Sequence, residues 1–274
     1  SPTMTDRADQ QEIERALRTI THLLDGMDDD LVARSGREAV DTKDDGTPVT
    51  AVDLEVDDRL RAGIAADLPG HGVVSEEGDT RVPDTEWTWV IDPIDGTSNY
   101  TTSVPYWCVS AALALRGEVV LGVVDAPALQ RRYVARRGHG TTRNGEPVRV
   151  RDTVEWSAPR NRHLAVMLST ATARRARAAG VRLNVRVMGS TALDLALVAD
   201  GGAIASVAVV PHVWDIAAGG LLVEEAGGEV ATVRGEPMLP LQAGVDHRST
   251  SAVTAAAADA RYATRLCEAL LAEQ

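Results

Sequence analysis

The chain reads Trp89-Val90-Ile91-Asp92-Pro93-Ile94-Asp95-Gly96-Thr97-Ser98-Asn99 about a third of the way along its length. The β-branched and aromatic residues at the start of this stretch predict a strand, which ends in two carboxylates spaced three residues apart. Carboxylates suit hard cations such as Mg²⁺, and a glycine followed by small hydroxyl residues at a helix start offers N–H donors to a phosphate. The stretch therefore predicts one loop that holds both a metal ion and an anion.

The residues inside this loop favour a stiff and accessible backbone. Pro93 fixes its own φ and holds Asp92 in an extended conformation. The carbonyl of Ile94 has no obvious partner in a strand ladder and is a further candidate ligand for a cation. Gly96 permits close approach of the backbone to an anion, while Thr97 can cap the next helix or orient a water.

The segments around the loop predict helices and strands throughout the chain. Apolar residues at helical spacing predict a helix over 13–24 and another over 51–68, with Asp53 and Asp57 on a second face of the latter. A hairpin is expected over 107–115 and 118–124, and Asn144-Gly145 is expected to form a turn. The other expected strands are 72–75, 130–135, 148–150, 185–188, 203–210 and 229–233. The other expected helices are 171–179, 192–199, 216–226 and 255–271, the last including the run of four alanines at 255–258.

Composition and charge narrow the class of protein. The chain has 274 residues, which suits either one large domain or two lobes around one cleft. The expected division into two is 1–150 and 151–274, with a boundary within 150–159. The formal charge of −12 argues against a nucleic-acid polymer as partner, because binding phosphate backbones takes clustered Lys and Arg. We expect no membrane span and no signal peptide, and two cysteines without metal-ligand spacing favour a cytoplasmic location.

Four acidic residues lie at predicted strand ends or helix starts, where side chains from separate elements converge. Considered singly, each has a structural explanation: Asp95-Gly96 can be a tight turn, and Asp215 can be the N-cap of a helix that begins at Ile216. The joint pattern favours a shared metal site, because the string from Asp92 to Thr97 combines four functional residue types. The four residues are Glu76, Asp92, Asp95 and Asp215.

Three segments in this order resemble the inositol monophosphatase family of Mg²⁺-dependent, lithium-sensitive phosphomonoesterases. They are Glu76-Glu77, Asp92-Pro93-Ile94-Asp95-Gly96-Thr97 and Trp214-Asp215-Ile216-Ala217-Ala218-Gly219. The resemblance extends from about residue 43 to 228. It implies an α+β fold, the layered αβαβα sandwich shared with fructose-1,6-bisphosphatases. It also implies hydrolysis of a small-molecule phosphate monoester by a metal-bound water, and similar proteins are commonly homodimers.

The resemblance also implies a role for each residue of the site. Phosphate would lie against the N–H groups of Gly96 and Thr97. Thr97, with Asp53 nearby and Glu76 as a metal ligand, would orient the attacking water. The implied ligands, for two or three Mg²⁺ ions per site, are Glu76, Asp92, the carbonyl of Ile94, Asp95 and Asp215.

Several basic residues are candidates for contact with an anionic substrate. Lys43 is the only lysine of the chain and lies where similar enzymes carry a lysine near the metals, although a solvated loop residue is an equal alternative. The pairs Arg131-Arg132 and Arg136-Arg137 can contact an anion or, on an edge strand, face water. His212 can reach the site or simply belong to a loop.

Two departures bear on the substrate. Ile204 and Ala208 stand where the family usually carries acidic residues, one of which binds a hydroxyl of inositol. A missing carboxylate removes a charge-assisted hydrogen bond worth roughly 1.5 to 3 kcal/mol. The stretch from Asp125 to Arg132 resembles the bacterial histidinol-phosphate phosphatase branch of this superfamily more than it resembles the animal enzymes. We therefore expect an amino-alcohol, sugar or nucleoside phosphate in place of plain inositol phosphate.

Three alternatives stay open on sequence grounds. The first is an inositol-1-phosphate or histidinol-phosphate phosphatase proper. The second is a haloacid-dehalogenase phosphatase, which also carries an Asp-rich string ending in Gly-Thr but uses a nucleophilic aspartate. The third is a catalytically weak family member with a regulatory binding role, against which the costly clustered charges argue.

Overall fold

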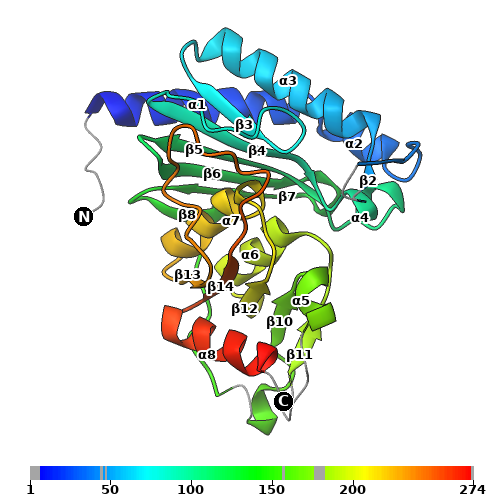
Figure 1. Ribbon diagram of the computed structural model, residues 1–274, viewed down its shortest axis with the longest axis vertical. Helices are drawn as coiled ribbons and strands as arrows, with labels where there is room; N and C mark the ends of the chain where they lie inside the picture. Colours follow the sequence, from blue (N-terminus) through cyan, green and yellow to red (C-terminus); the bar gives the residue numbers. More distant parts are fainter. Residues whose placement is uncertain (1–6, 44–45, 47, 156–157, 176–182, 273–274) are drawn as a thin grey trace.

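The computed structural model describes residues 7–43, 46, 48–155, 158–175 and 183–272, which form five layers of helix and sheet (Figure 1). Helices α1 (Arg7–Asp25) and α3 (Ala51–Asp67) cover one face of a seven-stranded sheet. Helices α6 (Thr191–Ala199) and α7 (Val213–Glu225) fill the layer between this sheet and a five-stranded sheet. Helix α8 (Ala260–Leu271) covers the outer face of the second sheet. The order of layers confirms the predicted α+β fold, a layered αβαβα sandwich.

The seven-stranded sheet carries the opening motif and has the order β3-β4-β5-β6-β7-β8-β9. Only the β3–β4 pair is parallel. The predicted hairpin is confirmed as β5 and β6, and Asn144-Gly145 forms the predicted turn with positive φ at both residues. Strand β8 was not predicted from the sequence. The strands are β3 (Gly72–Ser75), β4 (Trp87–Asp95), β5 (Cys108–Leu115), β6 (Glu118–Ala126), β7 (Arg131–Arg136), β8 (Gly140–Arg143) and β9 (Glu146–Val148).

The five-stranded sheet corrects the prediction for the run of alanines. Its order is β11-β10-β12-β14-β13, and residues 255–257 belong to β14 instead of the start of the last helix. In β14 Ala256 packs toward the middle layer, while Ala255 and Ala257 pack toward α8, so small side chains fill both crowded faces of an inner strand. The strands are β10 (Ala165–Leu168), β11 (Asn184–Arg186), β12 (Ala203–Ala208), β13 (Glu229–Arg234) and β14 (Val253–Ala257).

The remaining elements are short. Helix α2 (Asp28–Arg34) was not predicted, whereas α4 (Thr97–Thr101) begins where the motif predicts a helix start. The helix expected over 171–179 is α5 (Thr170–Arg175) as far as the described residues extend. The others are β1 (Asp41–Thr42), β2 (Pro48–Val49) and the 3₁₀ turns η1 (Pro127–Leu129) and η2 (Pro159–Asn161). In the described part of the chain, no helix has the length and apolar character needed to span a membrane.

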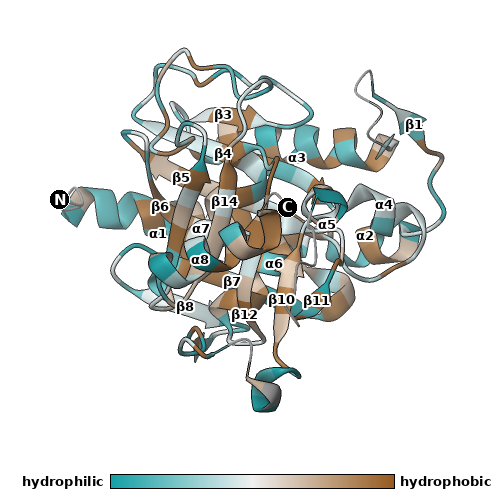
Figure 2. Ribbon diagram, turned by 60° about the horizontal axis from the view of Figure 1, so that its bottom comes forward, coloured by the Kyte–Doolittle hydropathy of each residue, from teal (hydrophilic) through white to brown (hydrophobic). Residues whose placement is uncertain are grey.

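Apolar side chains between the layers hold the sandwich together. In α1 the buried residues Ile13, Ala16, Ile20 and Leu24 recur every three or four positions and face the first sheet. Figure 2 shows the corresponding alternation of hydrophilic and hydrophobic residues along α3. Because α6 and α7 contact strands of both sheets, the core is continuous across the middle layer. The division into domains at residue 150 stays a prediction.

Candidate active site

A β-bulge brings the two carboxylates of the motif to the same face of β4. Asp92 pairs with Ser110 and Asp95 with Cys108, so three steps along β4 correspond to two along β5. Residues three apart in a regular strand point to opposite faces, and the extra residue of a bulge reverses this. The spacing of the two aspartates thus becomes compatible with one shared site.

Asp215 joins these two aspartates from the middle layer. Each of the three residues Asp92, Asp95 and Asp215 contributes one carboxylate oxygen, and these oxygens lie within 4.8 Å of one another. Such an arrangement can hold a metal ion. Asp215 lies in the first turn of α7, and its Oδ2 accepts the backbone N–H of His212 at 2.7 Å. The interpretation of Asp215 as an N-cap is therefore wrong, because the helix begins three residues earlier than expected and His212 is its N-cap.

The electrostatics of this cluster favour a bound cation. Burial, followed by the charges of Glu76, Asp95 and Asp215, raises the pKa of Asp92 well above its usual range. Burial also raises the pKa of Asp95 to about 6, although hydrogen bonds to its carboxylate work in the opposite direction. Oδ1 of Asp92 is buried without a hydrogen-bond partner among the described residues. A divalent cation would neutralise this repulsion and supply that oxygen with a ligand bond.

Glu76 follows β3 and is held by the predicted lysine. Lys43 Nζ donates to Glu76 Oε1 at 2.7 Å and also pairs with Glu77, so the solvated-loop alternative for Lys43 is wrong. The Glu76 backbone N–H donates to the carbonyl of Ile91 at 3.2 Å, which fixes Glu76 beside the strand that carries the aspartates. Its charge acts on Asp92, although the group of three converging carboxylates does not include it.

Thr97 and Asp53 form the other predicted pair. The Thr97 hydroxyl lies 3.0 Å from Asp53 Oδ1 and 3.0 Å from the carbonyl oxygen of Ile94, and it can donate its single hydrogen to either. Asp53 is buried in the first turn of α3, where its Oδ2 accepts from the backbone N–H and hydroxyl of Thr50 at 2.8 and 2.6 Å. Burial raises the pKa of Asp53, and these donors oppose the rise.

Gly96 is the residue that lets the chain turn from β4 into α4. Its φ of 95° is left-handed, and a Cβ at this position would lie 3.0 Å from the carbonyl oxygen of Tyr106. The first N–H groups of a helix have no partner within it, and Thr97 is the first residue of α4. The N–H groups of Gly96 and Thr97 therefore remain the candidates for binding phosphate.

Two residues that orient Asp95 were not predicted from the sequence. Its Oδ2 accepts the hydroxyl of Ser190 and the backbone N–H of Ala192, both at 2.7 Å. Ser190 is the N-cap of α6, so the start of a middle-layer helix holds a carboxylate from the first sheet. The sequence 189–192, Gly-Ser-Thr-Ala, indicates a helix start, but nothing in it indicates a partner so distant along the chain.

Comparison with known proteins decides the family. The sequence model of the inositol monophosphatase family matches residues 6–271. The chain is 36% identical to the histidinol-phosphatase of Mycobacterium tuberculosis, over 72% of this chain and 78% of that protein. It is 35% identical to the inositol-1-monophosphatase of Mesorhizobium japonicum, over 72% and 76% respectively. The chain belongs to the inositol monophosphatase family. As such, it is a metal-dependent phosphomonoesterase with a metal-binding acidic cluster, which excludes the haloacid-dehalogenase alternative.

Solved structures agree with this assignment. The inositol monophosphatase of Thermotoga maritima has a TM-score of 0.73 and 29% identity, covering 91% of this chain and 92% of its own. The extragenic suppressor protein SuhB from Bartonella henselae shares the fold with a TM-score of 0.79, at 24% identity, over 94% of this chain and 99% of its own.

In this family member the positions that depart from the usual pattern have different surroundings. Ile204 and Ala208 both lie on β12 and are buried. Ile204 packs in the apolar cluster beneath α8, so its side chain belongs to the core. Ala208 is the last residue of β12, pairs with Thr254 and leads into the segment that ends at Asp215. Ala208 is therefore the nearer of the two to Asp215 along the chain.

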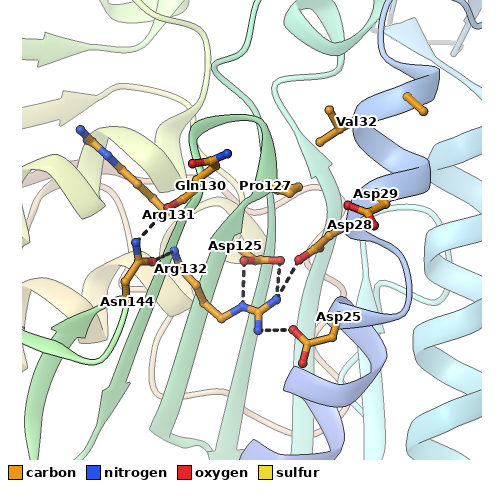
Figure 3. Close-up of a pocket in the computed structure, with 11 residues that line it drawn as sticks. Asp25, Asp28, Asp29, Val32, Asp125, Pro127, Gln130, Arg131, Arg132 and Asn144 are labelled. Atoms are coloured by element: carbon orange, nitrogen blue, oxygen red, sulfur yellow. Dashed lines mark hydrogen bonds and ion pairs between the residues drawn. The ribbon is translucent and has the colours of Figure 1, made fainter.

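Arg132 and Arg136 of β7 and Arg137, which follows the strand, pair with acids of the same chain. Figure 3 shows the Arg132 guanidinium pointing toward Asp125, Asp28 and Asp25. It contacts both oxygens of buried Asp125 at 2.8 and 3.1 Å, Asp28 at 3.0 Å and Asp25 at 2.6 Å. Arg136 pairs with Glu14, and Arg137, which follows the strand, pairs with Glu224. Arg132 therefore neither faces water on an edge strand nor is free to contact an anion. It links β6 to the junction of α1 and α2 through these ion pairs.

The same contact predicts a pH-dependent stability. Burial and the Asp125 carboxylate raise the pKa of Asp28 to about 7. Between about pH 4 and pH 7 the unfolded chain therefore releases a proton that the folded protein retains, so this residue's contribution to stability falls as pH rises. Asp28→Asn mimics the neutral acid at every pH. We therefore expect the free energy of unfolding of this variant, relative to that of wild type, to be about 2 kcal/mol higher at pH 8 than at pH 5. Urea unfolding at both pH values measures the difference, and an equal difference at both would contradict the prediction.

Proposed function

We propose that the chain hydrolyses a small-molecule phosphate monoester with Mg²⁺ bound at the acidic cluster, and that plain inositol phosphate is not its best substrate. The convergence of Asp92, Asp95 and Asp215 within 4.8 Å carries this proposal. The hydroxyl of Thr97 supports it, because Asp53 holds that hydroxyl beside the carbonyl of Ile94. Carboxylate and hydroxyl groups in this arrangement suit attack by water and require no covalent intermediate.

The orphaned Asp92 Oδ1 and the all-oxygen donor set fit a hard cation. When bound, such ions lower the pKa of water and neutralise charge that develops on the attacking and leaving oxygens. The residues proposed to hold them are Glu76, Asp92, the carbonyl of Ile94, Asp95 and Asp215.

The proposed roles of the protein's own groups follow from their hydrogen bonds. When Thr97 donates its hydrogen to Asp53, its oxygen keeps a lone pair that accepts a hydrogen bond from the attacking water. The N–H groups of Gly96 and Thr97 hold phosphate oxygens. Burial works to lower the pKa of Lys43, but the carboxylates of Glu76 and Glu77 raise it above its ordinary value, so Lys43 stays charged beside the phosphate.

The leaving group is proposed to be an amino alcohol, a sugar or a nucleoside. Ala208 offers no charged acceptor where an inositol hydroxyl would need one. Similarity to a protein named histidinol-phosphatase supports an amino alcohol among these classes. A homodimeric state and a cytoplasmic location stay predictions.

A panel of phosphate monoesters tests the proposal. Histidinol, sugar, nucleoside and myo-inositol phosphates are compared by phosphate release with and without Mg²⁺. We expect the best substrate to exceed myo-inositol 1-phosphate in kcat/KM by about 10- to 100-fold, since one charge-assisted hydrogen bond is missing. Equal efficiency on myo-inositol 1-phosphate would contradict the substrate assignment. Absence of Mg²⁺-dependent release from every compound would contradict the enzymatic proposal and favour the regulatory alternative.

A further inference from the structure

The loop that carries Glu76 is held at its start by a hydrogen bond to the buried carboxylate of Asp57. Ser75, the last residue of β3, is fully buried, and its hydroxyl donates a hydrogen bond to Asp57 Oδ1. Asp57 lies on α3 and is only 4% exposed. The residue next to Glu76 is therefore held by a group that the chemistry described above does not use.

Asp57 is in turn oriented by Arg61, one helical turn further along α3. Arg61 Nε donates to Asp57 Oδ2 at 2.7 Å, so both carboxylate oxygens are engaged. The guanidinium lies against Gly78 so closely that a Cβ there would be 1.9 Å from Nη2. The loop itself is closed by the Ser75 N–H, which donates to the carbonyl of Asp79 at 3.0 Å. Arg61 thus contacts the loop directly and through Asp57.

The same helix positions Thr97. Asp53 lies one turn before Asp57 on α3, so the two side chains project from neighbouring positions of one face. Asp53 bonds the hydroxyl of Thr97 at the start of α4, and Asp57 bonds Ser75 at the end of β3. One rigid helix therefore sets the positions of two segments that are separate in sequence.

We propose that Asp57 is a positioning residue that acts with Ser75 and Arg61 to fix the Glu76 loop for metal binding. The inference rests on the proposed function, because it requires Glu76 to be a metal ligand. A partly buried ion pair is a poor source of stability compared with apolar packing, so its presence beside this loop favours a role in geometry. Groups that hold metal ligands in position before the ion binds increase the affinity for the ion, because the ligands need not reorganise on binding.

Calorimetric titration with Mg²⁺ in the absence of substrate tests this. Substitution of groups that orient metal ligands typically weakens affinity 10- to 100-fold. Because Asp57 acts through the backbone of the loop, we expect about tenfold weaker Mg²⁺ binding in Ser75→Ala and Asp57→Asn. We also expect kcat at saturating Mg²⁺ within about twofold of wild type. Gly78→Ala provides a third variant, because a Cβ at this half-buried loop position displaces the guanidinium of Arg61. It should also weaken Mg²⁺ binding.

Thr141→Val is the matched control. Thr141 is as buried as Asp57, and its hydroxyl donates to the carbonyl of Leu222 at 2.7 Å, on a different part of the first sheet. It should lower the unfolding temperature without changing Mg²⁺ affinity. Unchanged affinity in the Ser75, Asp57 and Gly78 variants, or an equal loss in Thr141→Val, would overturn the inference and leave the proposed function standing. Absence of Mg²⁺ binding by the wild type would overturn both.

Discussion

Asp95→Asn should lower kcat/KM by about 10³-fold, equivalent to about 4 kcal/mol of transition-state stabilisation. The substitution keeps an oxygen that can accept the hydrogen bonds from Ser190 and Ala192, so the loop retains its shape. It removes one of three converging acidic groups and places an amide among the residues proposed to hold the cation. Steady-state rates at saturating Mg²⁺ measure the effect, and wild-type rates would sink the assigned role of Asp95.

The stability of the same variant should change in the opposite direction. Without Mg²⁺ the carboxylates of Asp92, Asp95 and Asp215 repel one another in a buried setting, and Asp95→Asn relieves part of that repulsion. We expect its unfolding temperature in chelator to equal or exceed that of wild type. Asp200→Asn is the control, because the Asp200 side chain is 3% exposed and accepts hydrogen bonds from Tyr133 and Arg143 outside the cluster. That control should lose stability and keep activity.

Arg132→Met should destabilise the fold by about 3 to 5 kcal/mol, because it leaves a buried carboxylate without its partner. The side chain of Asp125 is 3% exposed, and Arg132 provides the hydrogen bonds to both of its oxygens. Activity per folded molecule should stay near that of wild type, since the network lies between β6 and the α1–α2 junction. Urea unfolding gives the free energy, and a loss below about 1 kcal/mol would contradict the prediction.

Arg116→Met is the matched control for this experiment. Arg116 pairs with Glu86 at the surface, where the two side chains are 55% and 52% exposed. Exposed pairs of this kind contribute about 0 to 1 kcal/mol. A second test combines Arg132→Met with Asp125→Asn, which removes the unpaired charge and should recover part of the lost stability.

Short-range patterns allowed most of the fold to be predicted. Apolar spacing identified α1 and α3, and turn residues identified the β5–β6 hairpin. The prediction failed where tertiary surroundings override local preference. Residues 255–257 have the composition of a helix, yet they form an inner strand because only small side chains fit between α8 and the middle layer. Helix α2 is only seven residues long and has too little periodicity to be recognised.

The site was predictable for residues whose chemistry is local. Asp92 to Thr97 form one string, so their proximity follows from the sequence, and family resemblance adds Asp215. The contacts that orient these groups were not predictable, because Ser190 with Asp95 and Ser75 with Asp57 join distant segments through ordinary polar residues. A serine at a helix start or strand end carries no sequence signal that names its partner.

The close packing of α7 bears on the spacing of the carboxylate cluster. A Cβ at Gly122 of β6 would lie 2.9 Å from the carbonyl oxygen of Ala218, and one at Gly219 would lie 2.7 Å from Cβ of Leu195. Both contacts lie on the helix whose first turn carries Asp215. Glycine at these two positions therefore lets α7, which carries Asp215, pack closely against its neighbours. Engineering the spacing of this carboxylate cluster would begin at these glycines, which are not members of it.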